Sequence, residues 1–276
     1  MELIIDYLKF RSVPFNGSHL PERFGLFTIV VLGEAVLQVI EALSITVADD
    51  KVTSWVLAGF GIAIAYSLWW IYFNDFSGQV MKDKSRLSNT WLYLHLPLHM
   101  SHALLGALVS SILSAEGLVS ITMARIFFLN NAVIFFCNAA LKMVLTLSEY
   151  REEHGVTHDF GTSPSLPLWR MPTNFSKIYS LAFAGAAAAA RFLMGVVLLL
   201  CMLISENQLT QLVVMGIMLG CCIFQVVVDI TVEIFENRYL ISLEQQWENQ
   251  EREETQSSED DDDVASHLIH KPEDDD

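Results

Sequence analysis

Long runs of apolar residues recur along this chain, separated by short polar segments. Six of them have about 20 residues or more, which is enough to cross the ~30 Å hydrocarbon core of a bilayer as a helix. They cover residues 24–47, 53–76, 91–114, 118–147, 177–205 and 208–235. Because these runs leave too few residues for a soluble core, the pattern predicts an all-α, polytopic membrane helix bundle with about six transmembrane helices.

The spacing of the runs predicts how the chain is organised. Residues 24–147 form a four-helix membrane region, and a polar loop rich in Pro and Gly, residues 148–176, separates it from a final pair of spans at 177–235. The fifth run contains AFAGAAAAARF and the sixth contains Gly216-xxx-Gly220. Small residues let helix backbones approach closely in lipid, so we expect the last two spans to pack as a tight hairpin.

Composition agrees with a membrane protein, since 53% of the residues are hydrophobic. The formal net charge of −16 is unevenly distributed along the chain. From residue 244 onward there are 14 acidic residues, and the only basic ones are Arg252 and Lys271. Such a block cannot bury enough apolar surface to fold, so residues 236–276 are predicted to be an acidic, disordered tail. No basic stretch suggests a nucleic-acid partner, and the lipid bilayer is the expected environment.

Basic residues outside the spans predict the orientation, because positively charged loops stay cytoplasmic. They lie before the first span, between spans two and three, between spans four and five, and after the sixth. The residues are Lys9, Arg11, Arg23, Lys82, Lys84, Arg86, Arg151, Arg170 and Arg238. The opposite loops offer only Lys51, so we expect both termini, including the N-terminal segment 1–23, on the cytoplasmic side.

Several polar side chains lie inside the spans, where an ionisable group costs ~2.5 to 3.5 kcal/mol even on lenient insertion scales. Glu34, Gln38 and Glu41 share one helical face of the first span, and three histidines share one face of the third. The remaining buried candidates are single residues on the later spans. The full set comprises Glu34, Gln38, His99, His102, Arg191 and Asp229, with His95 beside the other two histidines.

These groups overlap in depth. From the rise of ~1.5 Å per residue, Glu34, His99, Arg191 and Asp229 lie about 10 to 21 Å from the cytoplasmic ends of their spans. We therefore expect one shared polar core, in which Glu34 pairs with Arg191 because neither has another obvious counter-ion at that depth. A purely structural ion pair is the alternative.

Three stretches resemble the bacterial low temperature requirement A family. They are HLPERFGLFTIVVLGEAV at the first span, LWWIYF closing the second and YLHLPL opening the third. The residues that match family positions are His19, Glu22, Arg23, Gly25, Gly33, Glu34 and His95. The resemblance implies the fold class more firmly than an activity, and His99 and His102 depart from the usually aliphatic family pattern.

The resemblance covers about residues 13–114, which correspond to the C-terminal portion of the family domain. The opening portion has no counterpart before Met1. We expect either a truncated gene product or a divergent member in which spans four to six have been substituted.

Ionisable residues inside a membrane mark ion pathways, so the favoured interpretation is a transporter or channel-like protein that carries a small ion or proton, and not an enzyme. Glu34 would exchange the ion, Arg191 or His99 would be its switchable partner, and Glu22 with Arg23 would form a cytoplasmic gate. No cofactor or metal is expected, and a homo-oligomer is compatible with the spans.

Two other classes stay open. One is an intramembrane metal-dependent lipid hydrolase with His95, His99 and His102 as ligands, although one helix spreads these residues over roughly 10 Å. The other is a non-catalytic membrane scaffold that docks through its acidic tail.

Overall fold

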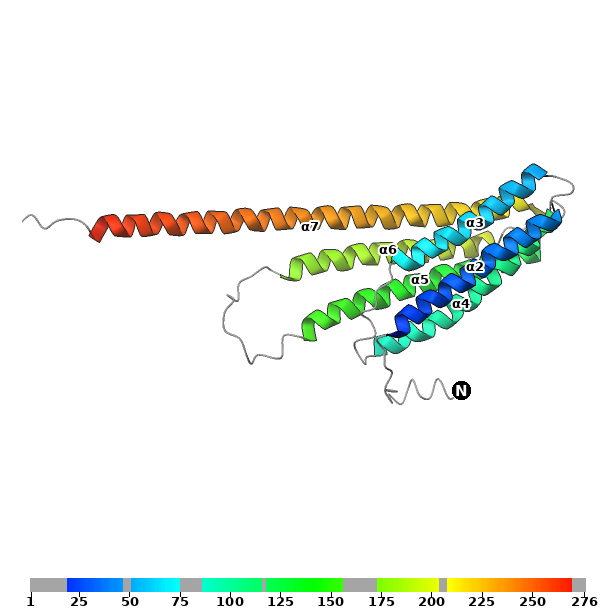
Figure 1. Cartoon of the computed structure of the whole chain (residues 1–276), viewed down its shortest axis with the longest axis horizontal. Coiled ribbons are helices and arrows are strands. Elements are labelled where there is room, and N and C mark those ends of the chain that lie inside the picture. The colour runs from blue at the N-terminus through cyan, green and yellow to red at the C-terminus, as the bar shows by residue number, and fades with distance from the viewer. Residues whose placement is uncertain are drawn as a thin grey trace, which may run out of the picture. The chain divides into compact units, whose positions relative to one another are not determined.

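The predicted spans are helical in a computed structural model of the chain, which describes residues 19–46, 51–74, 86–115, 118–155, 173–203 and 208–269. Its elements are α2 (Leu20–Thr46), α3 (Lys51–Asn74), α4 (Arg86–Leu113), β1 (Leu118–Ser120), α5 (Ile121–Gly155), α6 (Thr173–Cys201), β2 (Gln208–Thr210) and α7 (Gln211–Ile269) (Figure 1). All six described helices are long and apolar enough to cross a membrane. The all-α fold is thus confirmed, and the protein is an integral, multi-pass membrane protein.

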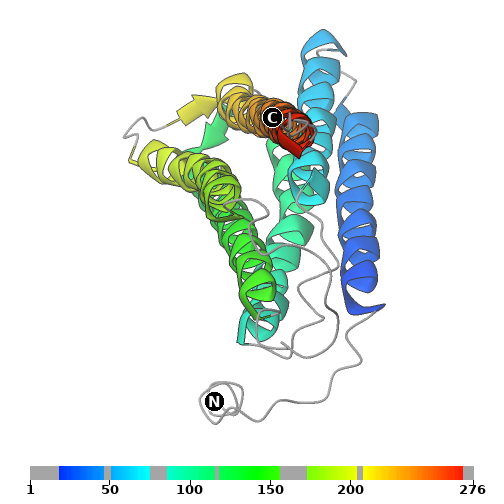
Figure 2. The same ribbon diagram turned by 90° about the vertical axis from the view of Figure 1, so that its left-hand side faces the viewer.

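The chain divides into two compact units, residues 1–232 and residues 233–276. The first unit contains α2 to α6 and the first part of α7, and it holds the buried core. Among the described residues, the most extensive helix packing is of α2 with α4, α2 with α3, α4 with α5, and α5 with α6, and α3 also contacts α4. Figure 2 shows α3 beside α2, and α6 beside α5.

Glycines set two of these close approaches. A Cβ at Gly106 of α4 would lie 2.7 Å from the Cα of Ala35 in α2, and a Cβ at Gly195 of α6 would lie 2.6 Å from the Phe136 ring in α5. Neither distance is possible for a real side chain, so glycine at these positions lets the helices come together.

The predicted tight hairpin of the last two spans is wrong. The backbone of α6 packs against α5, and within the described residues α6 and α7 have no comparable close backbone packing. A Cβ at Gly185 or at Gly220 would meet no atom within 4 Å, so neither glycine serves a helix contact. Small residues permit close packing, but the helix that uses them is chosen by the whole bundle.

Two short strands replace the first residues of spans four and six. β1 and β2 pair antiparallel, with Leu118 opposite Thr210. Each strand ends in a helix cap, because the Ser120 hydroxyl accepts a hydrogen bond from the Met123 amide and the Thr210 hydroxyl accepts one from the Val213 amide. The strands therefore tie the beginnings of α5 and α7 together at one end of the bundle.

The side chain of Gln211 completes this end of the bundle. Its amide nitrogen donates to the carbonyl oxygens of Ile112, Leu113 and Ala115 at the end of α4. The last carbonyls of a helix lack the usual helical partner, so Gln211 adds hydrogen bonds at this end, where the Ile112 carbonyl also accepts one from the Ala115 amide.

Two predicted segments are more helical than expected. α5 continues to Gly155 and α6 begins at Thr173, so both helices extend into the predicted loop 148–176 and shorten it. α7 continues to Ile269, through most of the tail that was predicted to be disordered. Residues 233–269 contain eight Glu and four Gln, which have good helix propensity. Residues 1–18 of the N-terminal segment, 156–172 of the loop and 270–276 of the tail lie outside the described residues.

Candidate functional site

The first polar cluster lies between α2, α3 and α4. Nδ1 of His95 lies 2.8 Å from the carbonyl oxygen of Trp91, and Nε2 lies 3.0 Å from the hydroxyl of Tyr72. A carbonyl can only accept, so Nδ1 carries a proton. In the neutral imidazole, Nε2 then accepts a hydrogen bond from Tyr72. The His95 side chain is buried, and both of its nitrogens are satisfied without water.

One helical turn further along α4, His99 makes a similar contact to α2. The hydroxyl of Thr28 donates to the carbonyl oxygen of Phe24 at 2.9 Å, and it lies 2.8 Å from Nε2 of His99. Because the single hydroxyl proton is used for the carbonyl, Nε2 of His99 is the donor to Thr28. The ring of Phe24 lies against both histidines, at centroid distances of 4.8 Å from His95 and 5.7 Å from His99.

This cluster unites the three stretches that carry the family resemblance. Phe24 and Thr28 come from the first stretch, Tyr72 from the second and His95 from the third. The sequence singled out His95 and His99 by their shared face, but it missed Thr28 and Tyr72. The one sign of them in the sequence was that they lie within the same stretches. Their contacts with the histidines form only when α2, α3 and α4 pack together.

The third histidine of the stripe does not join the others around one point. His102 is fully buried, and neither of its ring nitrogens has a hydrogen-bond partner among the described residues. His95 already uses both nitrogens. Within the part of the chain that the structure describes, no group of three or more His, Cys, Asp or Glu side chains is arranged to hold a metal ion.

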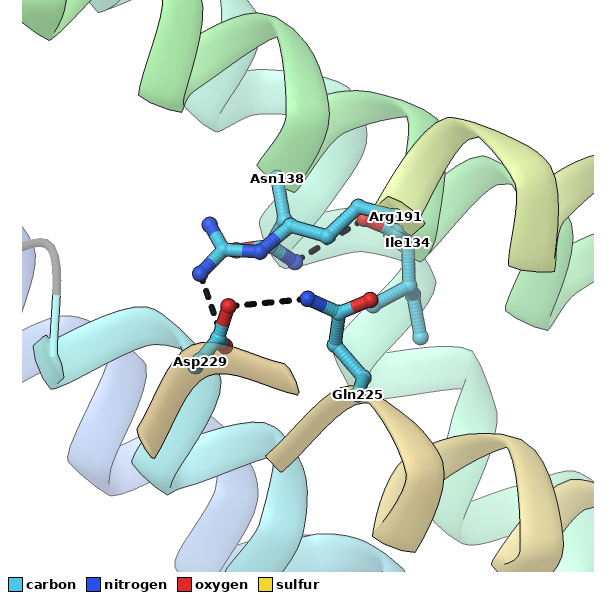
Figure 3. A network of polar contacts seen from close by, with 5 residues as sticks. All are labelled: Ile134, Asn138, Arg191, Gln225 and Asp229. Atoms are coloured by element: carbon cyan, nitrogen blue, oxygen red, sulfur yellow. Dashed lines mark hydrogen bonds and ion pairs between the residues drawn. The ribbon is translucent and has the colours of Figure 1, made fainter. Parts of the chain in front are cut away.

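A second polar cluster lies between α6 and α7 (Figure 3). Nη2 of Arg191 donates to Oδ2 of Asp229 at 2.9 Å, and Nε2 of Gln225 donates to Oδ1 of the same carboxylate at 2.8 Å. All three side chains are buried. Asn138 of α5 lies beside them and donates to the carbonyl oxygen of Ile134 at 2.9 Å.

The expected pairing of Glu34 with Arg191 is wrong, because Arg191 pairs with Asp229. Glu34 lies on the exposed face of α2 and accepts a hydrogen bond of 3.2 Å from Nε2 of Gln38. Gln38 is half-buried and covers Gly106, where α2 meets α4, and Glu41 is exposed. The polar groups thus form two buried clusters, with Glu34 outside both of them.

The remaining matched residues lie around the start of α2. His19 and Glu22 are exposed, with 3.6 Å between Nδ1 and Oε2, and Arg23 is exposed beside them. Gly25 is buried, whereas Gly33 is exposed, and a Cβ added at Gly33 would meet no atom within 4 Å. An exposed pair such as His19 and Glu22 contributes little to stability.

The comparison with protein families supports the resemblance that the three stretches suggested. The family model of the bacterial low temperature requirement A protein matches residues 3–214. The chain belongs to this family. The match extends over α5, α6 and the first residues of α7, so the expectation that the resemblance ends near residue 114 is wrong, as is the expectation that spans four and five are substituted.

A relative in this comparison comes from Rhizobium meliloti (strain 1021) and is described as an uncharacterized protein. It is 34% identical over 94 residues, which are 32% of this chain and 22% of the relative. The match thus spans about a fifth of the relative's length. No solved structure is significantly similar to this chain. In this member of the low temperature requirement A family, the two buried clusters are the features that bear on function.

Proposed function

We propose that this protein is a transporter or channel that moves a proton or small cation across the membrane, and that the ion pair of Arg191 and Asp229 is its switching element. Transport is proposed in preference to catalysis. The observation that carries the proposal is a complete ion pair inside the membrane, buried between two helices.

Energetics favour a functional explanation of this pair. Removing two charges from water costs more than their attraction usually returns, and apolar residues of similar volume often stabilise a protein as well or better. A pair in the middle of two spans therefore adds little stability that leucine or methionine could not supply. Ionisable residues kept inside a membrane are typical of ion and proton pathways.

The geometry around Asp229 also suits an exchange. Arg191 and Gln225 each hold one carboxylate oxygen, and Oε1 of Gln225 is buried without a hydrogen-bond partner among the described residues. A proton on Asp229 would remove the charge that holds Arg191. The Gln225 amide could then rotate and offer Oε1 as the acceptor. Alternatively, Oδ1 and Oε1 together would offer two oxygen ligands to a small cation.

The test is ion flux in liposomes. Purified protein is reconstituted with a pH-sensitive dye inside the liposomes to follow protons, or with a Na⁺-sensitive dye to follow Na⁺, after a gradient is imposed. Asp229→Asn keeps the size of the side chain and should abolish flux. The matched control is Glu233→Gln, which changes an exposed carboxylate one turn further along α7 and should leave flux unchanged.

A double variant separates function from structure. Arg191→Met with Asp229→Leu removes both charges at similar volume, so the bundle should stay folded, as judged by its thermal unfolding. Loss of flux in this folded protein supports the proposal. Unchanged flux in the same protein would make the pair structural and would overturn it.

A further inference from the structure

An apolar pocket of about 550 Å³ lies on the membrane-facing side of α2 and α4. Its volume falls in the range of small-molecule sites, which is ~300 to 1,000 Å³. Its lining is almost entirely apolar, and it extends between Arg23 at one end and Ala103 at the other. Phe27, Leu96 and Met100 are exposed, so the pocket opens toward the surrounding lipid.

The pocket runs from the membrane interface toward the bilayer centre. α2 and α4 are parallel, because the contacts Phe24 to Trp91 and Thr28 to His99 advance along both helices together. Arg23 lies about 5 Å from the beginning of its span, whereas Ala103 lies about 24 Å from the beginning of its own, at ~1.5 Å per residue. An apolar space that extends over this depth can take a lipid acyl chain.

Charge is present at one end only. Arg23 is the one ionised side chain among the residues that line the pocket, and it stands at the interface where lipid headgroups lie. An arginine presents a planar set of donors that matches a phosphate group. The apolar body and the single cation at its mouth are together complementary to an amphiphile with one negative headgroup.

We propose that this pocket is a specific site for an anionic phospholipid of the surrounding bilayer. One acyl chain fills the space between α2 and α4, and the headgroup phosphate pairs with Arg23. The site does not depend on the proposed transport activity.

The wall of the pocket is fixed in place, which distinguishes it from an ordinary lipid-facing groove. The ring of His99 stacks on Phe24 with 12° between the planes, and it meets Phe27 edge-on at 4.8 Å between centroids. The Thr28 hydroxyl holds Nε2 of His99 at 2.8 Å. A preformed wall loses little conformational entropy when a chain binds, so it favours a defined occupant over mobile annular lipid.

Native mass spectrometry of the full-length protein in detergent tests the site. The protein is titrated with phosphatidylglycerol and with phosphatidylcholine that carry identical acyl chains. Wild type should retain one phosphatidylglycerol with about fivefold preference, the effect expected of one arginine at an anionic headgroup. Arg23→Gln should bind both lipids with the weaker affinity, and because Arg23 is exposed the variant should fold normally.

A second pair of variants tests the chain-binding part. Ala103→Phe fills the deep end of the pocket and should abolish retention of the lipid. Ala107→Phe adds the same ring to an exposed position one turn further along α4, outside the pocket, and should bind like wild type. Equal retention of the two lipids by wild type, or unchanged binding by Ala103→Phe, would overturn the proposal. Wild type without any lipid adduct would also overturn it, since another occupant, such as residues 1–18 or a second copy, would then take the place of the lipid.

Discussion

Arg191 of α6 and Asp229 of α7 meet at 2.9 Å between Nη2 and Oδ2, and both side chains are buried. Neither residue lies near its partner in sequence, and neither belongs to the stretches that first suggested the family. The pair joins the last two spans where their backbones do not pack closely. An interaction of charged groups thus replaces the small-residue contact that the glycines had suggested.

Breaking this pair on one side should be costly. Asp229→Ala leaves the Arg191 guanidinium buried without its carboxylate, and we expect the free energy of unfolding to fall by about 3 to 5 kcal/mol. Thermal unfolding in detergent measures the loss. The double variant Arg191→Met with Asp229→Leu leaves no buried charge, so it should have most of the stability that Asp229→Ala loses. A double variant as unstable as Asp229→Ala would contradict this account.

Glu34 tests which carboxylate carries the proposed ion exchange. Glu34 is exposed and lies outside both buried clusters, so we expect Glu34→Gln to retain flux in the liposome assay. The isosteric amide keeps a hydrogen-bonding group beside Gln38. Loss of flux in Glu34→Gln together with retention in Asp229→Asn would return the exchanging role to Glu34.

The close approach of α2 and α4 depends on Gly106. Gly106→Ala places a methyl group 2.7 Å from the Ala35 backbone, so the two helices must separate, at a cost of about 1 to 3 kcal/mol. Gly33→Ala is the control, because a methyl group there has open space and alanine favours helix. The melting temperature should fall for the first variant only.

The hydroxyl of Thr28 links α2 to α4 through His99. Thr28→Val keeps the shape of the side chain but leaves Nε2 of His99 without its acceptor, so stability should fall by about 1 to 3 kcal/mol. Tyr66→Phe removes an exposed hydroxyl from α3 and serves as the control. Equal melting temperatures for Thr28→Val and wild type would show that the hydrogen bond contributes nothing.

His95 and His102 should respond differently to the same substitution. His95→Leu removes the buried hydrogen bonds to the Trp91 carbonyl and to the Tyr72 hydroxyl, so it should destabilise the bundle. His102→Leu removes a buried ring whose nitrogens have no partner among the described residues, so it should be neutral or stabilising. A comparable loss in both variants, measured by thermal unfolding, would indicate that bound water satisfies His102.

The amino-acid sequence by itself determined the six spans. The thickness of the bilayer fixes how long an apolar run must be, and such a run consists of consecutive residues, so it is visible without the tertiary structure. It also identified His95, Arg191 and Asp229 as polar groups inside the membrane, and their depth follows from counting residues along a helix. It did not determine their partners. Only the tertiary structure decided that Arg191 faces Asp229, because the direction a side chain faces depends on how each helix is rotated against its neighbours. Close packing, such as that of Gly195 in α6 against the Phe136 ring in α5, constrains that rotation, and it depends on residues far apart in the chain.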